Sequence, residues 1–126
     1  MNEPIASLME RRVWSIDMDD TVADIEALFA DKGLTWAPVL ESGRTVIGVI
    51  SAADLLQFRA HGREPAAARA WQLCTYRPIT VAAHTPIAEV ARLMVERRIH
   101  HVVVTEDDGI VGIVSSLDFV RRFAGD

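Results

Sequence analysis

The sequence predicts an α/β (α+β) fold built from two β-α-β-β-α repeats that pack with approximate twofold symmetry. Two observations carry this prediction. The apolar positions Val22, Ile25, Leu28 and Phe29 recur 65 residues later as Ile87, Val90, Leu93 and Met94. The segment 46–54 (VIGVISAAD) recurs 64 residues later at 110–118 (IVGIVSSLD). A duplication of this length indicates one structural unit written twice.

The elements of the first half follow from local patterns. A short strand is expected at 14–16, and the apolar spacing predicts a helix over 22–32. Thr21 with Asp24 forms a capping-box pattern at the start of that helix, and Gly33 suits its end. Nearly apolar runs predict buried strands at 36–40 and 46–50, joined by a polar turn, and a second helix runs from about Ser51 to Arg59.

The second half repeats these elements in the same order. It begins with a short strand at 79–81, followed by a helix with Thr85 as the cap and Pro86 at the first helical position. The helix ends near Arg97, strands follow at 101–105 and 110–114, and the last helix covers 116–123.

The repeats are expected at 1–60 and 71–126, with a linker at 61–70 that contains Gly62 and Pro65. The alanine-rich part from Ala66 to Leu73 predicts a short helix that leads into the second repeat. Leu8-Met9 and Leu73-Cys74 correspond as lead-in segments, which predicts a buried apolar slot for Met9 and Cys74. A half of about 60 residues buries little surface alone, so the halves are expected to pack as one module.

Composition places the protein among ordinary globular proteins. The chain has 126 residues, 50% hydrophobic and 25% charged, with one cysteine and a formal net charge of −5. The acidic balance argues against general nucleic-acid binding, and a lone cysteine fits a reducing compartment. No apolar run is long enough for a membrane span, and the N-terminus lacks a signal-peptide core. We therefore expect a cytoplasmic location.

Three phrases together resemble the CBS domain pair (Bateman module), named after cystathionine β-synthase. They are APVLE with its Pro38, Gly48-Val-Ile-Ser51-Ala-Ala-Asp54, and Gly112-Ile-Val-Ser115-Ser-Leu-Asp118. The resemblance runs from about Pro4 to Phe123. It implies a free-standing regulatory module that binds AMP, ADP, ATP or S-adenosylmethionine in the cleft between the repeats, as a ligand and not as an obligatory cofactor. It also implies a flat homodimer and an unidentified regulated partner protein.

The two Ser-x-x-Asp phrases have two interpretations. Ser51 with Asp54 and Ser115 with Asp118 match a helix capping box, which needs no ligand. The same helix start offers free N–H groups and a positive dipole to a phosphate, and an aspartate can accept both ribose hydroxyls. The duplication and the resemblance favour ligand binding for at least one copy. Asp118 is the better candidate because cations stand near it in the sequence.

Those cations are Arg97, Arg98, His100 and His101. The two arginines also suit the solvated C-terminus of a helix, and neighbouring strand residues such as His100 and His101 face opposite ways, which disfavours a shared metal. The resemblance places a basic pair here that points at ligand phosphates. The first half has Thr35-Trp36 instead, so we expect one competent site or two of unequal affinity.

A further set matches family positions that line the base pocket, although each member also fits a plain core role. These residues are Ile16, Ala37, Ile50, Thr80, Val102 and Val114. Trp36, Trp14 and Trp71 can stack on adenine or simply pack, and Trp36 leads because it lies on the strand that the family uses.

Of two other function classes, a structural module stays open and an enzyme is disfavoured. The alternative to ligand sensing is a structural or dimerisation module with a degenerate pocket. No nucleophile–base pair or catalytic motif supports an enzyme. A homodimer is also expected from apolar helix faces at Ile25/Leu28/Phe29 and Val90/Leu93/Met94, which exceed what one small globule can cover.

Overall fold

The computed structural model describes residues 2–125, which group into two packing units. The first packing unit is Trp14–Pro78, and the second joins residues 2–13 to residues 79–125. Each unit therefore contains one repeat together with the lead-in segment of the other repeat. The repeat boundaries at 60 and 71 stay a prediction, since packing divides the chain at other places.

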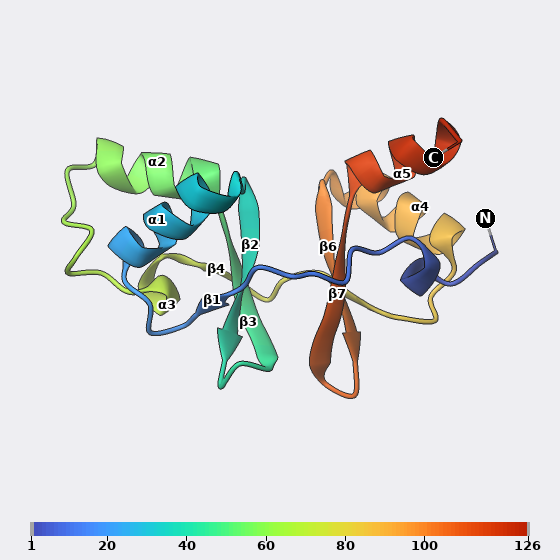
Figure 1. Cartoon of the computed structure of the whole chain (residues 1–126), viewed down its shortest axis with the longest axis horizontal. Coiled ribbons are helices and arrows are strands. Elements are labelled where there is room, and N and C mark those ends of the chain that lie inside the picture. The colour runs from blue at the N-terminus through green and yellow to red at the C-terminus, as the bar shows by residue number, and fades with distance from the viewer. Residues whose placement is uncertain (1, 126) are drawn as a thin grey trace. The chain divides into compact units, whose positions relative to one another are not determined.

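The first packing unit contains a four-stranded sheet in the order β1-β2-β3-β4. Strand β1 runs parallel to β2, and the other neighbours are antiparallel. Helices α1 and α2 lie together on one side of this sheet (Figure 1). The elements are β1 (Ile16–Asp17), α1 (Val22–Lys32), β2 (Trp36–Glu41), β3 (Thr45–Ser51), α2 (Ala52–Ala60), α3 (Ala70–Leu73) and β4 (Thr75–Tyr76).

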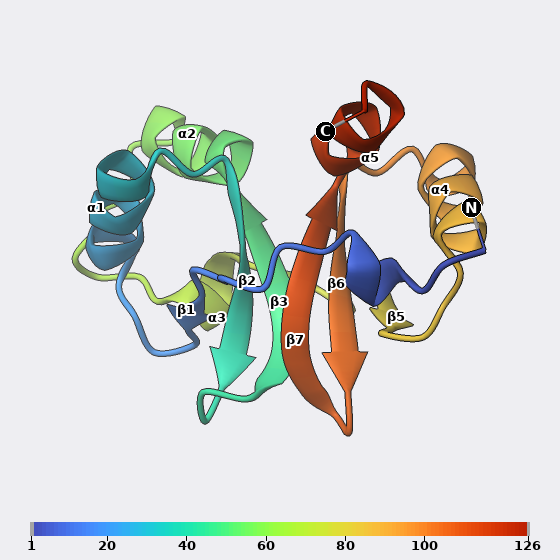
Figure 2. The ribbon, with the colours of Figure 1, turned by 45° about the vertical axis from the view of Figure 1, so that its right-hand side comes forward.

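The second packing unit has a three-stranded sheet in the order β5-β6-β7, again parallel and then antiparallel. Its elements are η1 (Ile5–Ser7), β5 (Thr80–Ala82), α4 (Ile87–Arg97), β6 (His101–Glu106), β7 (Gly109–Ser115) and α5 (Ser116–Phe123). The N-terminal segment, blue in Figure 2, reaches β7, where Glu10 and Ile113 exchange backbone hydrogen bonds of 2.8 and 3.0 Å. Glu10 thereby takes the place that β4 has in the first unit.

The predicted β-α-β-β-α order is confirmed in both repeats. The duplication extends to a backbone irregularity, because the ladder shifts register between Val39 and Leu40 and, 65 residues later, between Val104 and Thr105. Two helix starts differ by one residue: Ser51 and Pro86 are N-caps that precede their helices, so Thr85 is not the N-cap that the sequence predicts. The strand bounds differ from the predicted ones by one or two residues. Only Ala70–Leu73 of the alanine-rich segment is helical. The sequence does not predict β4, because a strand of two residues is too short to show a periodicity.

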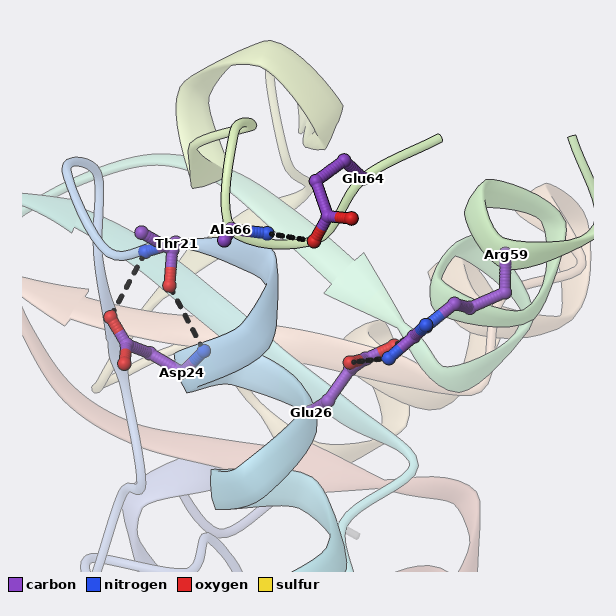
Figure 3. A network of polar contacts seen from close by, with 6 residues as sticks. All are labelled: Thr21, Asp24, Glu26, Arg59, Glu64 and Ala66. Atoms are coloured by element: carbon purple, nitrogen blue, oxygen red, sulfur yellow. Dashed lines mark hydrogen bonds and ion pairs between the residues drawn. The ribbon is translucent and has the colours of Figure 1, made fainter. Parts of the chain in front are cut away.

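Local chemistry explains the first helix. Thr21 Oγ1 accepts from the N–H of Asp24 at 3.1 Å, and Asp24 Oδ2 accepts from the N–H of Thr21 at 3.2 Å, so the predicted capping box is present (Figure 3). Gly33 ends the helix with φ of 65°, a left-handed conformation that suits glycine. Arg59 donates two hydrogen bonds to Glu26, at 2.7 and 2.9 Å, and so joins α2 to α1; this lowers the pKa of Glu26.

Each unit has its own hydrophobic core, to which the lead-in segment contributes. Cys74 belongs to the core of the first unit, and Ile5 and Met9 belong to the core of the second. The predicted burial of Met9 and Cys74 is confirmed, at 9% and 8% exposure. Each sulfur lies against a glycine of the facing strand, Cys74 beside Gly48 and Met9 beside Gly112.

Candidate functional site

Both repeats place a serine where a strand ends and a helix begins. Ser51 ends β3 and caps α2, and Ser115 ends β7 and caps α5. Across the ladder, Ser51 pairs with Trp36 and Ser115 pairs with His101. The start of each helix therefore lies beside the first residue of the neighbouring strand, and the residue before that strand contributes as well. Ala52 N–H donates to the carbonyl of Thr35 at 2.8 Å, and Ser116 N–H donates to the carbonyl of His100 at 3.0 Å.

The aspartates take part in capping in both copies. Asp54 Oδ2 accepts from the N–H of Ser51 at 2.8 Å, and Asp54 N–H donates to Ser51 Oγ at 3.2 Å. Asp118 Oδ2 accepts from the N–H of Ser115 at 2.8 Å and from its hydroxyl at 3.3 Å. The capping interpretation is thus confirmed for both boxes, and each uses Oδ2. Because Oδ1 stands outside these bonds, capping leaves room for a second role.

Charged and ionisable side chains stand at the start of α5. His100 is exposed and His101 is half-buried. Burial lowers the pKa of His101, the neighbouring His100 lowers it further, and Asp118 opposes both. Arg98 ends α4 in a left-handed conformation with φ of 54°, the role that Gly33 has in the first unit. The sequence suits Arg98 both to a solvated helix end and to the group of cations near Asp118; its alignment with Gly33 is the signal for the left-handed conformation.

The start of α2 carries different side chains in the same frame. Gly33, Thr35 and Trp36 occupy the positions of Arg98, His100 and His101. The neighbouring Lys32 points elsewhere, with Nζ 3.3 Å from Asp31 Oδ2 and 4.4 Å from the centre of the Trp14 ring. The three positions around the start of α2 therefore carry no basic side chain, and the unequal affinity of the two sites stays a prediction.

The apolar candidates for the base pocket are core residues in the structure. Their exposed fractions are 0–1%, and the set is Ile16, Ala37, Ile50, Val102 and Val114. Thr80 is exposed, and Trp36 is half-buried. Trp14 and Trp71 are exposed by 39% and 43%. A side chain can contact a ligand only where it reaches the surface, so Thr80 and Trp36 are better placed for this than the five core residues.

The predicted dimer faces are wrong, because most of each helical stripe packs into the core of its own unit. Ile25, Phe29, Val90 and Met94 are exposed by at most 6%, and Leu28 and Leu93 are half-buried. Exposed apolar side chains lie instead on other faces, at Leu56, Val95, Leu117, Val120 and Phe123, with exposed fractions of 51–78%. A helical stripe shows which side of a helix is apolar but not whether a sheet already covers it.

Sequence reasoning also missed a groove between α4 and α5. Its volume is about 500 Å³, and it is mostly apolar. Val95, Val120 and Phe123 line it along the helices, and Arg98, His100 and Ser116 contribute its polar groups. Val95 and Val120 are apolar residues outside the buried stripes of α4 and α5, and that is the sequence signal for the groove.

The CBS domain model matches residues 5–61 and 70–125. The chain belongs to the CBS domain family. The two matched ranges are both CBS domains, as the duplicated phrases predicted, and they take up nearly all of the chain. Among residues 2–125, no helix is long and apolar enough to cross a membrane, and no group of three or more His, Cys, Asp or Glu side chains could hold a metal ion.

Relatives and solved structures agree with this assignment. The CBS domain-containing protein CBSX3, mitochondrial, of Arabidopsis thaliana is 30% identical over 108 residues, which are 82% of this chain and 52% of that protein. An uncharacterised protein of Methanocaldococcus jannaschii is 29% identical over 125 residues, 96% of this chain and 44% of that protein. The chain thus spans about half the length of these relatives. The crystal structure of CBSX2 in complex with AMP has a TM-score of 0.83 at 25% identity, covering 97% of this chain and 96% of that one.

Proposed function

We propose that this CBS domain pair is a regulatory module that binds adenosyl ligands, with its main site at the start of α5. The observation that supports this most is the position of Asp118 at a helix start, beside His100 and His101. The chain also belongs to a family whose member CBSX2 was crystallised with AMP. The ligand's occupancy would be passed to a partner protein. The partner would be a protein whose activity is adjusted according to the adenylate state.

The chemistry of this helix start suits a nucleotide. The N–H groups of the first turn and the helix dipole favour phosphate, and Arg98 and His100 add positive charge nearby. An ionised aspartate only accepts hydrogen bonds, so Asp118 can take ribose hydroxyls through the oxygen that the capping box leaves out. Phosphate and ribose would then be held by different groups of the same turn.

Thermal unfolding with and without AMP tests the proposal. A ligand at about 100 times its Kd adds roughly 2.7 kcal/mol to the free energy of unfolding, which raises Tm by about 8–12 °C in a domain of this size. A shift below one degree with millimolar AMP, ADP, ATP and S-adenosylmethionine would refute ligand sensing.

A pair of matched variants separates capping from binding. Asp118→Asn should weaken AMP binding about 10- to 150-fold in calorimetric titration, because the amide loses charge-assisted acceptance. Asp24→Asn changes the equivalent capping acid of α1 and serves as the control, since it alters the cap without touching the site. Equal AMP affinity in the wild type and Asp118→Asn would refute the assignment of Asp118.

The groove between α4 and α5 supports a second role in self-association. Val95, Val120 and Phe123 expose 57–78% of their surface there, and contiguous apolar patches usually mark an interface. We propose a homodimer that uses this face. It is compatible with ligand sensing, and it is the function that would remain if no adenosyl compound bound.

A further inference from the structure

The groove between α4 and α5 has apolar walls and a basic end. Each helix lines it with residues three, four and seven positions apart, which share one face of a helix. They are Ala91, Met94, Val95 and Arg98 from α4 and its C-cap, and Ser116, Phe119, Val120 and Phe123 from α5, with Ile99 and His100 between the two helices. Among residues 2–125, no carboxylate lines this groove.

The polar groups of the groove gather at one end. Arg98 directly follows α4, and Ser116 is the first residue of α5. The N–H of Ser116 donates to the carbonyl of His100 at 3.0 Å, so the end of α4 and the start of α5 meet here. Phe123 is seven residues further along α5, or about 10 Å at 1.5 Å per residue. A basic end and an apolar end therefore lie a short molecule's length apart.

The basic side chains at this end have no internal acidic partner. Within the described chain, residues 2–125, no carboxylate forms an ion pair with Arg98 or His100. Asp118, the nearest acid on α5, directs Oδ2 to the N–H of Ser115. Arg98 is exposed and stays charged at any physiological pH. An anion can thus pair with Arg98 without displacing a group of the protein.

The rest of the groove suits a hydrocarbon or a ring. Met94 and Phe119, exposed by 5% and 6%, lie at its base, and its walls are the well-exposed Val95, Val120 and Phe123. Its volume of about 500 Å³ lies within the range of about 300–1,000 Å³ that is usual for small-molecule sites. Beyond the basic end the lining offers no polar side chain, so a sugar or a peptide would lose hydrogen bonds to water there.

We propose that the α4–α5 groove binds a small amphipathic anion, an organic acid whose carboxylate pairs with Arg98 and whose apolar tail lies between Val95 and Val120. This site goes beyond adenosyl binding and does not depend on it. The proposed homodimer would cover the same walls, but a twofold contact repeats the same residues and brings no carboxylate of the groove to Arg98. The acid matches both the walls and the charge, and it excludes a second copy from this face.

Calorimetric titration of the full chain with octanoate tests the site. Acetate keeps the carboxylate without the tail, and octylamine keeps the tail with the opposite charge. We expect octanoate to bind at least about 50-fold more tightly than acetate, because its tail leaves water, and octylamine not to bind. Where the protein is dimeric, saturating octanoate should lower its mass in light scattering towards 13.9 kDa.

Two matched pairs of variants locate the ligand. Arg98→Gln should weaken octanoate about 5- to 20-fold, whereas Arg97→Gln, which changes an exposed arginine outside the groove, should not. Val120→Asn should weaken octanoate about fivefold or more, whereas Leu117→Asn, which changes an exposed apolar residue of α5 outside the groove, should not. All four positions are exposed, so folding should be retained. AMP affinity should be unchanged in Val120→Asn.

The contrary outcomes are distinct. Octylamine binding as tightly as octanoate would show adsorption to apolar surface, and equal losses within either pair would place the ligand elsewhere; each overturns the proposal. A dimer whose mass is unchanged by saturating octanoate also overturns it. So does binding to anionic lipid vesicles without binding of octanoate, which would assign this face to a membrane. AMP binding without octanoate binding refutes this site alone, and the reverse result refutes only the proposed function.

Discussion

Gly48 and Gly112 occupy the same position in the duplicated phrase, yet replacing them with alanine should have unequal costs. A Cβ on Gly48 would lie 2.7 Å from both Cys74 Sγ and the carbonyl oxygen of Thr75. A Cβ on Gly112 would lie 2.6 Å from Met9 Sδ, 2.9 Å from Met9 Cγ and 3.0 Å from the carbonyl oxygen of Glu10. Gly48→Ala therefore collides with backbone, and Gly112→Ala collides mainly with a flexible side chain.

The magnitudes follow from what can move. Thr75 belongs to β4, which is paired with Val49 of β3, so its carbonyl cannot retreat without opening the ladder. Overpacking costs about 1–3 kcal/mol, and we place Gly48→Ala at or above the upper end of that range. Met9 has rotatable bonds that can absorb the contact, so we expect about 1 kcal/mol for Gly112→Ala. In a domain of this size each kcal/mol lowers Tm by about 3–4.5 °C.

Urea unfolding followed by circular dichroism provides the assay, with a constant m value as the condition for comparing midpoints. Removing the facing sulfur distinguishes the two cases. Gly112→Ala should cost little in a Met9→Ala background, because only the Glu10 carbonyl remains near. Gly48→Ala should keep most of its cost in a Cys74→Ala background, because the Thr75 carbonyl stays 2.7 Å from the new Cβ. Equal costs for the two glycines, or full rescue of Gly48→Ala by Cys74→Ala, would refute this reasoning.

Three further predictions concern single elements. Because burial holds the pKa of His101 below its usual value, the unfolded chain takes up a proton before the folded one as pH falls through about 6.5. Stability should therefore decline from pH 7.5 to pH 5, and His101→Gln should remove part of that decline in urea titrations; an unchanged slope would contradict it. Phe123→Glu should abolish self-association, so that light scattering gives the monomer mass of 13.9 kDa where the wild type gives twice that value; a monomeric wild type at micromolar concentration would remove the dimer proposal. Thr21→Ala should cost about 1 kcal/mol in thermal unfolding because α1 loses its N-cap acceptor, with AMP affinity unchanged; an altered AMP affinity would show that the cap and the site are coupled.

Most helices and strands of this protein can be predicted from short stretches of the sequence. Thr21, Asp24 and Gly33 specify where α1 starts and ends, because capping and left-handed termination depend on neighbours within a few residues. Ser115 and Asp118 likewise identify the start of α5, and the recurrence of the same pattern 64 residues after Ser51 and Asp54 shows that the unit is duplicated. The candidate site needed more than local sequence: the Ser-x-x-Asp pattern alone fits a capping box, and its duplication and the resemblance to the CBS family made it a predicted ligand site.

Long-range packing decided the features that local patterns left open. Leu8-Met9 and Leu73-Cys74 look alike as lead-ins, and nothing within either segment shows that each joins the sheet of the other repeat. The apolar stripes of α1 and α4 did not show that their own sheets already cover them, whereas Val120 and Phe123 stay exposed. Such choices depend on which surfaces meet after the chain has turned back on itself. A sequence pattern records that a side chain is apolar, but its partner is chosen by contacts between residues far apart in the chain.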